Sequence, residues 1–349
     1  MVQDKKTYQT IRVEDAVGST LAHDITEIRP GEFKGPSFRR GQKIEEKDIC
    51  RLMKLGKRHL YVLDLGKDEV HEDDAALELV SALSGKGVKY SSSPKEGKLS
   101  LIAGHDGLVK VNADGLREFN MVPEVMCASI HNNTQVKKGQ QLAGTRAIPL
   151  VIKRDILDAA LQIAADHTPI FTVKKFKRVK ARLIITGSEI YEGLIDDRFE
   201  EVVRKKITDF GSTLEETVIL PDDRDLIADT VQSFLEKGTE LIITTGGMSV
   251  DPDDVTRAGI IKAGIEEIYY SAAVLPGAMF QIAYKGEATV MGIPACALYH
   301  STTVFDLILP RIFAGEKVDN RDLAGLSHGG LCLNCDVCRY PVCPFGKGC

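Results

Sequence analysis

The chain has 349 residues, 43% of them hydrophobic, and a formal net charge of −5 at pH 7. This length exceeds that of one ordinary domain, so we expect two or three. The acidic balance argues against a nucleic-acid partner, and no stretch approaches the roughly 18 uninterrupted apolar residues of a membrane span. The polar segment at residues 1–9 is not typical of a secretory signal, which predicts a cytoplasmic protein.

Residues 1–84 are predicted to form a mixed N-terminal α+β region. Helical spacing of apolar residues predicts helices at 45–55 and 73–83. The short run at 59–63, which is mostly apolar and aromatic, predicts a strand between them. Residues 85–97 are rich in Gly, Ser and Lys, which is typical of a linker.

From residue 98 to 152 the pattern changes to short strands, which Asp-Gly and Asn turns at 104–107, 112–115 and 131–133 interrupt. Close spacing of such turns favours a small β-rich domain, which we assign to residues 85–152. A helix is expected at 153–166, and a basic run follows it. That run is either a solvated connector or an anion-binding surface. Residues 153–179 are therefore assigned as a helical connector.

Residues 180–318 alternate strand and helix, which predicts an α/β domain. Repeated strand–helix units indicate a mostly parallel sheet covered on both faces, a three-layer αβα arrangement. The predicted strands are 182–186, 214–220, 240–245, 267–275 and 288–291, and the predicted helices are 197–210, 222–238 and 298–314.

Polar residues follow three of these strands at the edge where α/β sheets bind ligands. The first strand ends in Gly187-Ser188-Glu189, the second in Pro221-Asp222-Asp223, and the third in Thr245-Gly246-Gly247-Met248-Ser249, before Asp251, Asp253 and Asp254. A glycine turn before a helix suits a phosphate, and carboxylates beside a phosphate predict Mg²⁺. The alternative for Asp222 or Asp223 is that it caps the next helix.

These segments, with Asp254-Val255-Thr256, resemble the molybdopterin-binding domain that molybdopterin adenylyltransferases and molybdopterin molybdotransferases share. The likeness covers about residues 180–315, and weaker likenesses to molybdotransferases occur at 16–25 and 144–150. The resemblance implies an αβα fold and a pterin dithiolene phosphate ligand with Mg²⁺. It also implies either transfer of AMP to that phosphate or metal insertion with release of AMP.

The resemblance further implies site residues. The catalytic positions it implies are Glu189, Asp223 and Asp254. The positions it implies for binding molybdopterin or the molybdenum cofactor are Asp222, Thr245, Gly246, Gly247, Met248, Ser249, Asp253 and Pro294.

Two turns depart from the pattern of the molybdotransferases. Leu275-Pro276-Gly277-Ala278-Met279 stands where Lys-Pro-Gly-Lys-Pro is usual, and Pro294-Ala295-Cys296-Ala297 stands where Pro-Gly-Asn-Pro is usual. Positive charge and close N–H donors hold anionic ligands. Because these two turns lack such groups, the sequence as a whole supports ligand binding better than catalysis.

The last part of the chain, residues 319–349, is predicted to be a cysteine-rich metal-binding tail. Cys332-x2-Cys335-x2-Cys338-x4-Cys343-Pro344 differs by one residue in its last gap from a bacterial ferredoxin run. Four thiolates suit one [4Fe–4S] cluster or one Zn²⁺ ion, and a tail without metal is the third alternative. Cys349 is interpreted as a spare thiol.

Three functions follow from this reading of the sequence. The first is a Mg²⁺-dependent nucleotidyl or metal transferase of molybdenum or tungsten cofactor biosynthesis. The second is a non-catalytic carrier, insertion factor or redox sensor that binds the cofactor, and the third is an interaction scaffold. The expected partners are a pterin phosphate, ATP or AMP, and a molybdoenzyme, and the resemblance suggests a homodimer or homotrimer. No nucleic acid and no membrane are expected.

Overall fold

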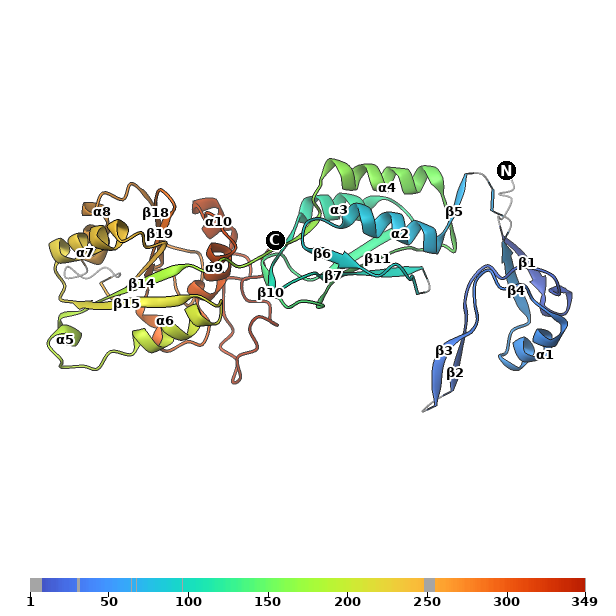
Figure 1. The fold of residues 1–349 in the computed structure, drawn as a ribbon, viewed down its shortest axis with the longest axis horizontal. Coiled ribbons are helices and arrows are strands. Elements are labelled where there is room, and N and C mark those ends of the chain that lie inside the picture. The colour runs from blue at the N-terminus through green and yellow to red at the C-terminus, as the bar shows by residue number, and fades with distance from the viewer. Residues whose placement is uncertain are drawn as a thin grey trace. The chain divides into compact units, whose positions relative to one another are not determined.

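The computed structural model describes residues 8–29, 32–63, 65–66, 68–95, 97–247 and 255–348. The chain divides into two compact units, which are drawn in Figure 1. Unit 1 comprises residues 1–104, 111–130 and 138–172, and unit 2 comprises residues 105–110, 131–137 and 173–349. Within the described ranges, no helix is long and apolar enough to cross a membrane.

The first part of unit 1 is a small α/β region with its own apolar core. Its elements are β1 (Tyr8–Arg12), η1 (Val13–Asp15), β2 (Ile25–Arg29), β3 (Phe33–Phe38), α1 (Glu46–Lys54) and β4 (His59–Leu63). β1 pairs with β4, and β2 pairs with β3, both antiparallel. The core includes Val13, Leu21, Phe38 and Leu52, each at most 1% exposed. The helix and strand predicted here are confirmed.

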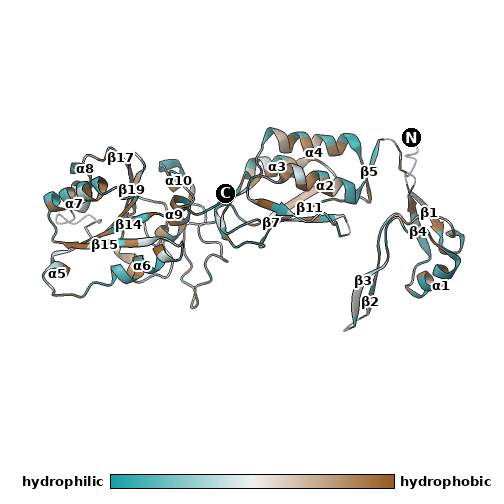
Figure 2. Cartoon of the chain, viewed as in Figure 1, coloured by the Kyte–Doolittle hydropathy of each residue, from teal (hydrophilic) through white to brown (hydrophobic). Residues whose placement is uncertain are grey.

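The second part of unit 1 is a four-stranded antiparallel sheet of order β6-β7-β11-β9, against which α2 packs. Helices α2 and α4 each carry hydrophilic and hydrophobic residues, and they pack on one another (Figure 2). The elements are β5 (Glu69–His71), α2 (Glu72–Leu83), β6 (Val88–Tyr90), β7 (Lys98–Ala103), α3 (Ala113–Met121), β9 (Val125–Ser129), β11 (Gln141–Ala147), β12 (Val151–Lys153) and α4 (Arg154–Asp166).

Two local predictions in this region are wrong. The stretch Asn112–Gly115 is not a turn between strands, because Asn112 Oδ1 accepts a hydrogen bond from the Gly115 N–H at 3.0 Å and so caps helix α3. Strand β6 lies inside the predicted linker 85–97.

A further sheet of order β10-β8-β13 is formed by β8 (Gly107–Val111), β10 (Thr134–Val136) and β13 (Phe171–Lys174).

The main sheet of unit 2 has six strands in the order β15-β14-β16-β19-β18-β17. The first four strands are parallel, and β18 and β17 are antiparallel to their neighbours. The strands are β14 (Lys180–Thr186), β15 (Thr213–Leu220), β16 (Leu241–Thr245), β17 (Glu267–Tyr270), β18 (Gln281–Lys285) and β19 (Ala288–Ile293). The predicted α/β fold with a largely parallel sheet is confirmed.

Helices cover both faces of this sheet. They are α5 (Ser188–Tyr191), α6 (Phe199–Thr208), α7 (Arg224–Glu236), α8 (Thr256–Lys262), α9 (Val304–Phe313) and α10 (Asn320–Gly325), with the 3₁₀ helix η2 (Ala295–Leu298). α6 and α9 share one buried core with the sheet, and α7 and α8 share the other (Figure 1). All five residues of β16 are buried between these layers.

Two strand predictions in unit 2 need correction. The strand predicted at 267–275 ends at Tyr270, because Ser271 has a φ of +67°, which extended strands do not adopt. Strand β18 was not predicted, although its first four residues are buried.

The cysteine-containing tail is folded onto unit 2. Phe345 is 4% exposed and belongs to the same core as α6 and α9. The Tyr340 hydroxyl donates a hydrogen bond to the Asp306 carbonyl at 3.0 Å. Two backbone hydrogen bonds, Leu275 N–H to Gly330 O and Cys332 N–H to Leu275 O, each 2.8 Å, attach the tail to the loop after β17.

Candidate functional site

The carboxyl ends of β14, β15 and β16 lie at one edge of the sheet because these strands are parallel. Thr186 is paired with Leu220, and Ile185 is paired with Thr245. The strand-end rim is defined here as residues 186–189, 220–223 and 245–247. The loops of this rim contain most of the predicted site residues that the structure describes.

The Gly246–Gly247 turn lies so close to Thr186 and Thr256 that it has no room for side chains. A Cβ on Gly246 would lie 2.1 Å from the Thr186 carbonyl oxygen, and one on Gly247 would lie 2.4 Å from Thr256 Oγ1. The φ angles are +82° and +54°, which glycine adopts without strain. These two glycines are therefore required by the geometry of the rim.

Neither glycine N–H of this turn donates a hydrogen bond within the described residues. Thr186 Oγ1 donates to the Thr245 carbonyl at 3.1 Å and lies 2.9 Å from Thr256 Oγ1. Thr245 Oγ1 is buried and has no hydrogen-bond partner in the described part of the chain. Because buried polar atoms are normally paired, this hydroxyl and the two N–H groups, which have no partner within the described ranges, indicate a site for a polar ligand.

The acids of the rim have distinct positions. Asp222 accepts hydrogen bonds from the Ser188 N–H at 2.8 Å and the Ser188 hydroxyl at 3.2 Å, and so joins the loops after β14 and β15. Asp223 caps α7, because its Oδ1 accepts from the N–H groups of Asp225 (2.8 Å) and Leu226 (3.1 Å). The Glu189 carboxylate lies beside Gly187, about 3.1–3.2 Å from where a Cβ would be.

The described acids do not fit a Mg²⁺ site. Asp222 and Asp223 each use an oxygen to bond backbone N–H groups. Among the residues that the structure describes, no three His, Cys, Asp or Glu side chains are placed to hold a metal ion. The predicted residues Met248, Ser249, Asp253 and Asp254 lie outside the described residues. The predicted ion is therefore without a site in the described part of the rim.

Pro294 lies on the same edge as the rim. It directly follows β19, the parallel neighbour of β16, and begins the 3₁₀ helix η2. The turn at 275–279, which also departs from the pattern of the molybdotransferases, includes Gly277. A Cβ on Gly277 would lie 2.5 Å from the Val304 side chain, so packing against α9 requires a glycine there.

Sequence reasoning missed Gln281, which is fully buried. Neither its side-chain nitrogen nor its oxygen has a hydrogen-bond partner among the described residues. Gln281 pairs with Gly292, which in turn pairs with Thr244 one residue before the end of β16. A glutamine between Phe280 and Ile282 in an apolar run was the available signal.

The four cysteines of the predicted metal site lie around one cavity of about 200 Å³. We call Cys332, Cys335, Cys338 and Cys343 the cysteine run. None of the four is in a disulfide, and Cys338 Sγ lies 3.4 Å from Thr302 Oγ1. Cys349 lies outside the described residues.

Comparison with protein families gives two matches. Residues 182–314 match a family described as a probable molybdopterin binding domain, and residues 10–64 match a domain of unknown function. A CinA-like protein of Thermosipho melanesiensis is 32% identical over 92 residues, 26% of this chain and 23% of its own. A molybdopterin molybdenumtransferase of Synechococcus elongatus is 23% identical over 223 residues, 61% of this chain and 54% of its own. The chain thus spans between about a quarter and a half of the length of these relatives.

Among solved structures, the molybdopterin biosynthesis Mog protein of Mycobacterium ulcerans is similar at 18% identity and a TM-score of 0.35, over 40% of this chain and 97% of that one. The family match coincides with the segment whose motifs resemble that family, from β14 through α9. Residues 182–314 are a domain of the molybdopterin-binding family.

Proposed function

We propose that the strand-end rim binds molybdopterin or its adenylate through the ligand phosphate, and that the chain acts in the biosynthesis of the molybdenum or tungsten cofactor. The observation that carries the proposal is the Gly246–Gly247 turn, which has no room for side chains and offers two N–H groups that have no partner among the described residues. Such a turn is a concave donor site for an anion. The buried Thr245 hydroxyl beside it supplies a further donor.

A pair of threonine substitutions tests this proposal. In the described part of the chain, the buried hydroxyls of Thr245 and Thr217 both lack hydrogen-bond partners, but Thr217 lies within β15, away from the strand ends. Replacing either by valine removes a desolvated hydroxyl and should stabilise the fold slightly, by up to about 1 kcal/mol. Thr245→Val should weaken molybdopterin binding by about tenfold, and Thr217→Val should leave it unchanged.

Binding is measured by titrating the purified protein into molybdopterin, and into its adenylate, and following pterin fluorescence. The protein contains no tryptophan, which simplifies the reading. If wild type and Thr245→Val bound the pterin with equal affinity, the strand-end rim would be rejected as the binding site. No pterin binding by the folded wild type would overturn the proposed function and leave the scaffold interpretation.

A catalysed nucleotidyl or metal transfer is the second candidate function. The Glu189 carboxylate stands at the rim and accepts no hydrogen bond among the described residues, so it is available to a ligand. The relative from Synechococcus elongatus is named a molybdenumtransferase. Because the described acids do not form a Mg²⁺ site, no step is assigned to that ion here.

Transfer and binding alone are separated by assays of AMP release and ATP consumption with the pterin present. In the transfer case, Asp254→Ala should abolish turnover while the protein stays folded. Turnover that survives this substitution would contradict the assignment of Asp254. Tight pterin binding without turnover in the wild type would establish a carrier, insertion factor or redox sensor. Light scattering tests the proposed homo-oligomer, and co-purification tests a molybdoenzyme partner.

A further inference from the structure

We propose that the cysteine run ligates one [4Fe–4S] cluster in the cavity that it lines. This site is separate from the strand-end rim and does not depend on the function proposed there. The four thiols belong to one turn-rich segment of 12 residues, from Cys332 to Cys343. They line a single cavity together with Tyr340 and His300.

The frame around the cavity is fixed by contacts that do not involve the thiols. On one side, the backbone of Cys332 is bonded to Leu275. On the other, Phe345 is buried in the core, and a Cβ on Gly346 would lie 2.4 Å from Leu307. The Tyr340 hydroxyl bonds to the backbone of α9 between these two anchors. The tail is thus anchored on both sides of the cysteines, and the loop between the anchors is available to a ligand.

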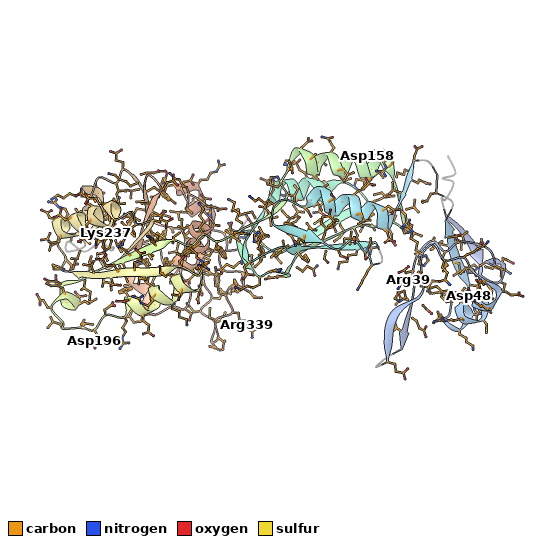
Figure 3. The ribbon with its side chains drawn as sticks, in the orientation of Figure 1. Arg39, Asp48, Asp158, Asp196, Lys237 and Arg339 are labelled. Carbon is orange, nitrogen blue, oxygen red and sulfur yellow. The ribbon has the colours of Figure 1, made fainter. Side chains whose placement is uncertain are left out.

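The charges near the cavity favour an anionic centre. A [4Fe–4S] cluster with four thiolate ligands carries a net charge of roughly −2 in its oxidised form. Arg339, which is labelled in Figure 3, lines the cavity. A second cation, Lys347, interacts electrostatically with Cys343. Lys347 also donates to Thr134 at 2.9 Å, which fixes its position.

The size of the cavity favours a cluster over a single ion. Four thiolates bind zinc at about 2.3 Å and close around it completely. A single zinc ion would therefore need a larger closure of the cavity of about 200 Å³ than a cube of four iron and four sulfide ions, which fills a space between its ligands. In the described residues, no three cysteines already stand in metal-binding positions. We therefore expect the loop to close on the cluster, since metal sites rarely exist fully formed before binding.

The experiment is anaerobic purification followed by iron, acid-labile sulfide and zinc analysis and a visible spectrum. The expected result is about four iron and four sulfide ions per chain, with broad absorption that bleaches on reduction by dithionite. Cys338→Ser should lose most of the iron. Cys50→Ser, which changes an exposed free cysteine of unit 1, should retain it.

A second measurement guards against misfolded variants. Wild-type protein stripped with a chelator should keep its far-ultraviolet circular dichroism, because the anchors of the tail do not use the thiols. Reconstitution with iron and sulfide under a thiol reductant should restore the absorption in wild type and Cys50→Ser, but not in folded Cys338→Ser. One zinc ion per chain, or no metal uptake by folded wild type, would overturn the cluster. Equal iron in both variants would remove the cysteine run as its ligand set.

Discussion

The strand-end rim and the cysteine tail belong to the same unit, but the two sites depend on their residues in opposite ways. The rim depends on side chains that are absent, because a Cβ on Gly246 would meet the Thr186 carbonyl and one on Gly247 would meet the Thr256 side chain. The tail depends on side chains that are present, because its backbone anchors leave four thiols around a cavity. A site of the first kind is lost when an atom is added. A site of the second kind is lost when an atom is removed, while the fold survives.

The largest effect is expected at Gly246. In Gly246→Ala the new methyl group would overlap the Thr186 carbonyl oxygen, a backbone atom 2.1 Å away that cannot rotate aside. Strain and steric overlap together should lower the free energy of unfolding by about 3–5 kcal/mol. Urea denaturation followed by circular dichroism measures the loss.

Gly238→Ala is the matched control for this substitution. Gly238 has a similar φ of +72°, but a Cβ there meets nothing within 4 Å. Its cost should be only that of the backbone conformation, about 1 kcal/mol. Equal losses in the two variants would show that close approach of backbones does not shape the rim.

The second effect is the pH dependence of the junction between α9 and the tail, where Glu316 lies. Burial alone would raise the pKa of Glu316, but Lys110, Arg311 and Lys174 bond to it and lower its pKa to about 2. Because the folded pKa lies below the usual 4.5, stability is full above about pH 4.5 and is lost as the pH falls towards 2. The loss should reach up to about 3 kcal/mol.

Denaturation of wild type and Glu316→Gln at a series of pH values tests this. The variant should be less stable at pH 7 and should show a smaller decline between pH 5 and pH 2. Burial lowers the pKa of Lys110 although Glu316 raises it, which reduces the net gain from this pair. Parallel curves for the two proteins would contradict the role of Glu316.

A smaller effect separates capping from ligand binding at the rim. Asp223→Ala removes the cap of α7 and should cost about 1 kcal/mol. Asp197→Ala removes a comparable cap, since Asp197 accepts from the N–H groups of Phe199 and Glu200 at the start of α6. If Asp223 also contacts the ligand, only Asp223→Ala should weaken pterin binding. Unchanged binding in both variants would reduce Asp223 to a cap.

The smallest effect concerns the anchor of the tail. Tyr340→Phe removes the hydrogen bond to the Asp306 carbonyl and should cost about 0.5–1.5 kcal/mol. Because no thiol is altered, the iron content should stay at the wild-type value. A variant of normal stability that loses its iron would show that the anchors and the thiols are not separable.

Much of the αβα domain was predictable because its local signals agree with its tertiary packing. The strands β14 and β16 contain runs of apolar residues, β15 ends in the β-branched and apolar run 217–220, and α6 and α7 have amphipathic spacing with glycines after them. The strand β18 was missed because Gln281 and Lys285 enclose only three apolar residues, and its place at the sheet comes from pairing with β19. Pairing partners are not readable from a segment alone.

The rim was only partly predictable for a similar reason. Its glycines and acids stand in the sequence, and parallel strands place their ends together. The contact between Thr186 and Thr256 joins residues 70 positions apart, and no local pattern announces it. The spacing of the cysteine run likewise indicates ligands, but it does not reveal that Phe345 and Tyr340 bind the tail to the core.

The attachment of the tail to Leu275 has a consequence for how this surface can diverge. Both hydrogen bonds use the backbone, and the Leu275 side chain is 57% exposed. These two backbone hydrogen bonds therefore place little restriction on which residue stands at position 275. A basic side chain can be gained or lost there without disturbing the attachment. The side chain at this position, and with it the local charge, can therefore change while the backbone attachment of the tail stays in place.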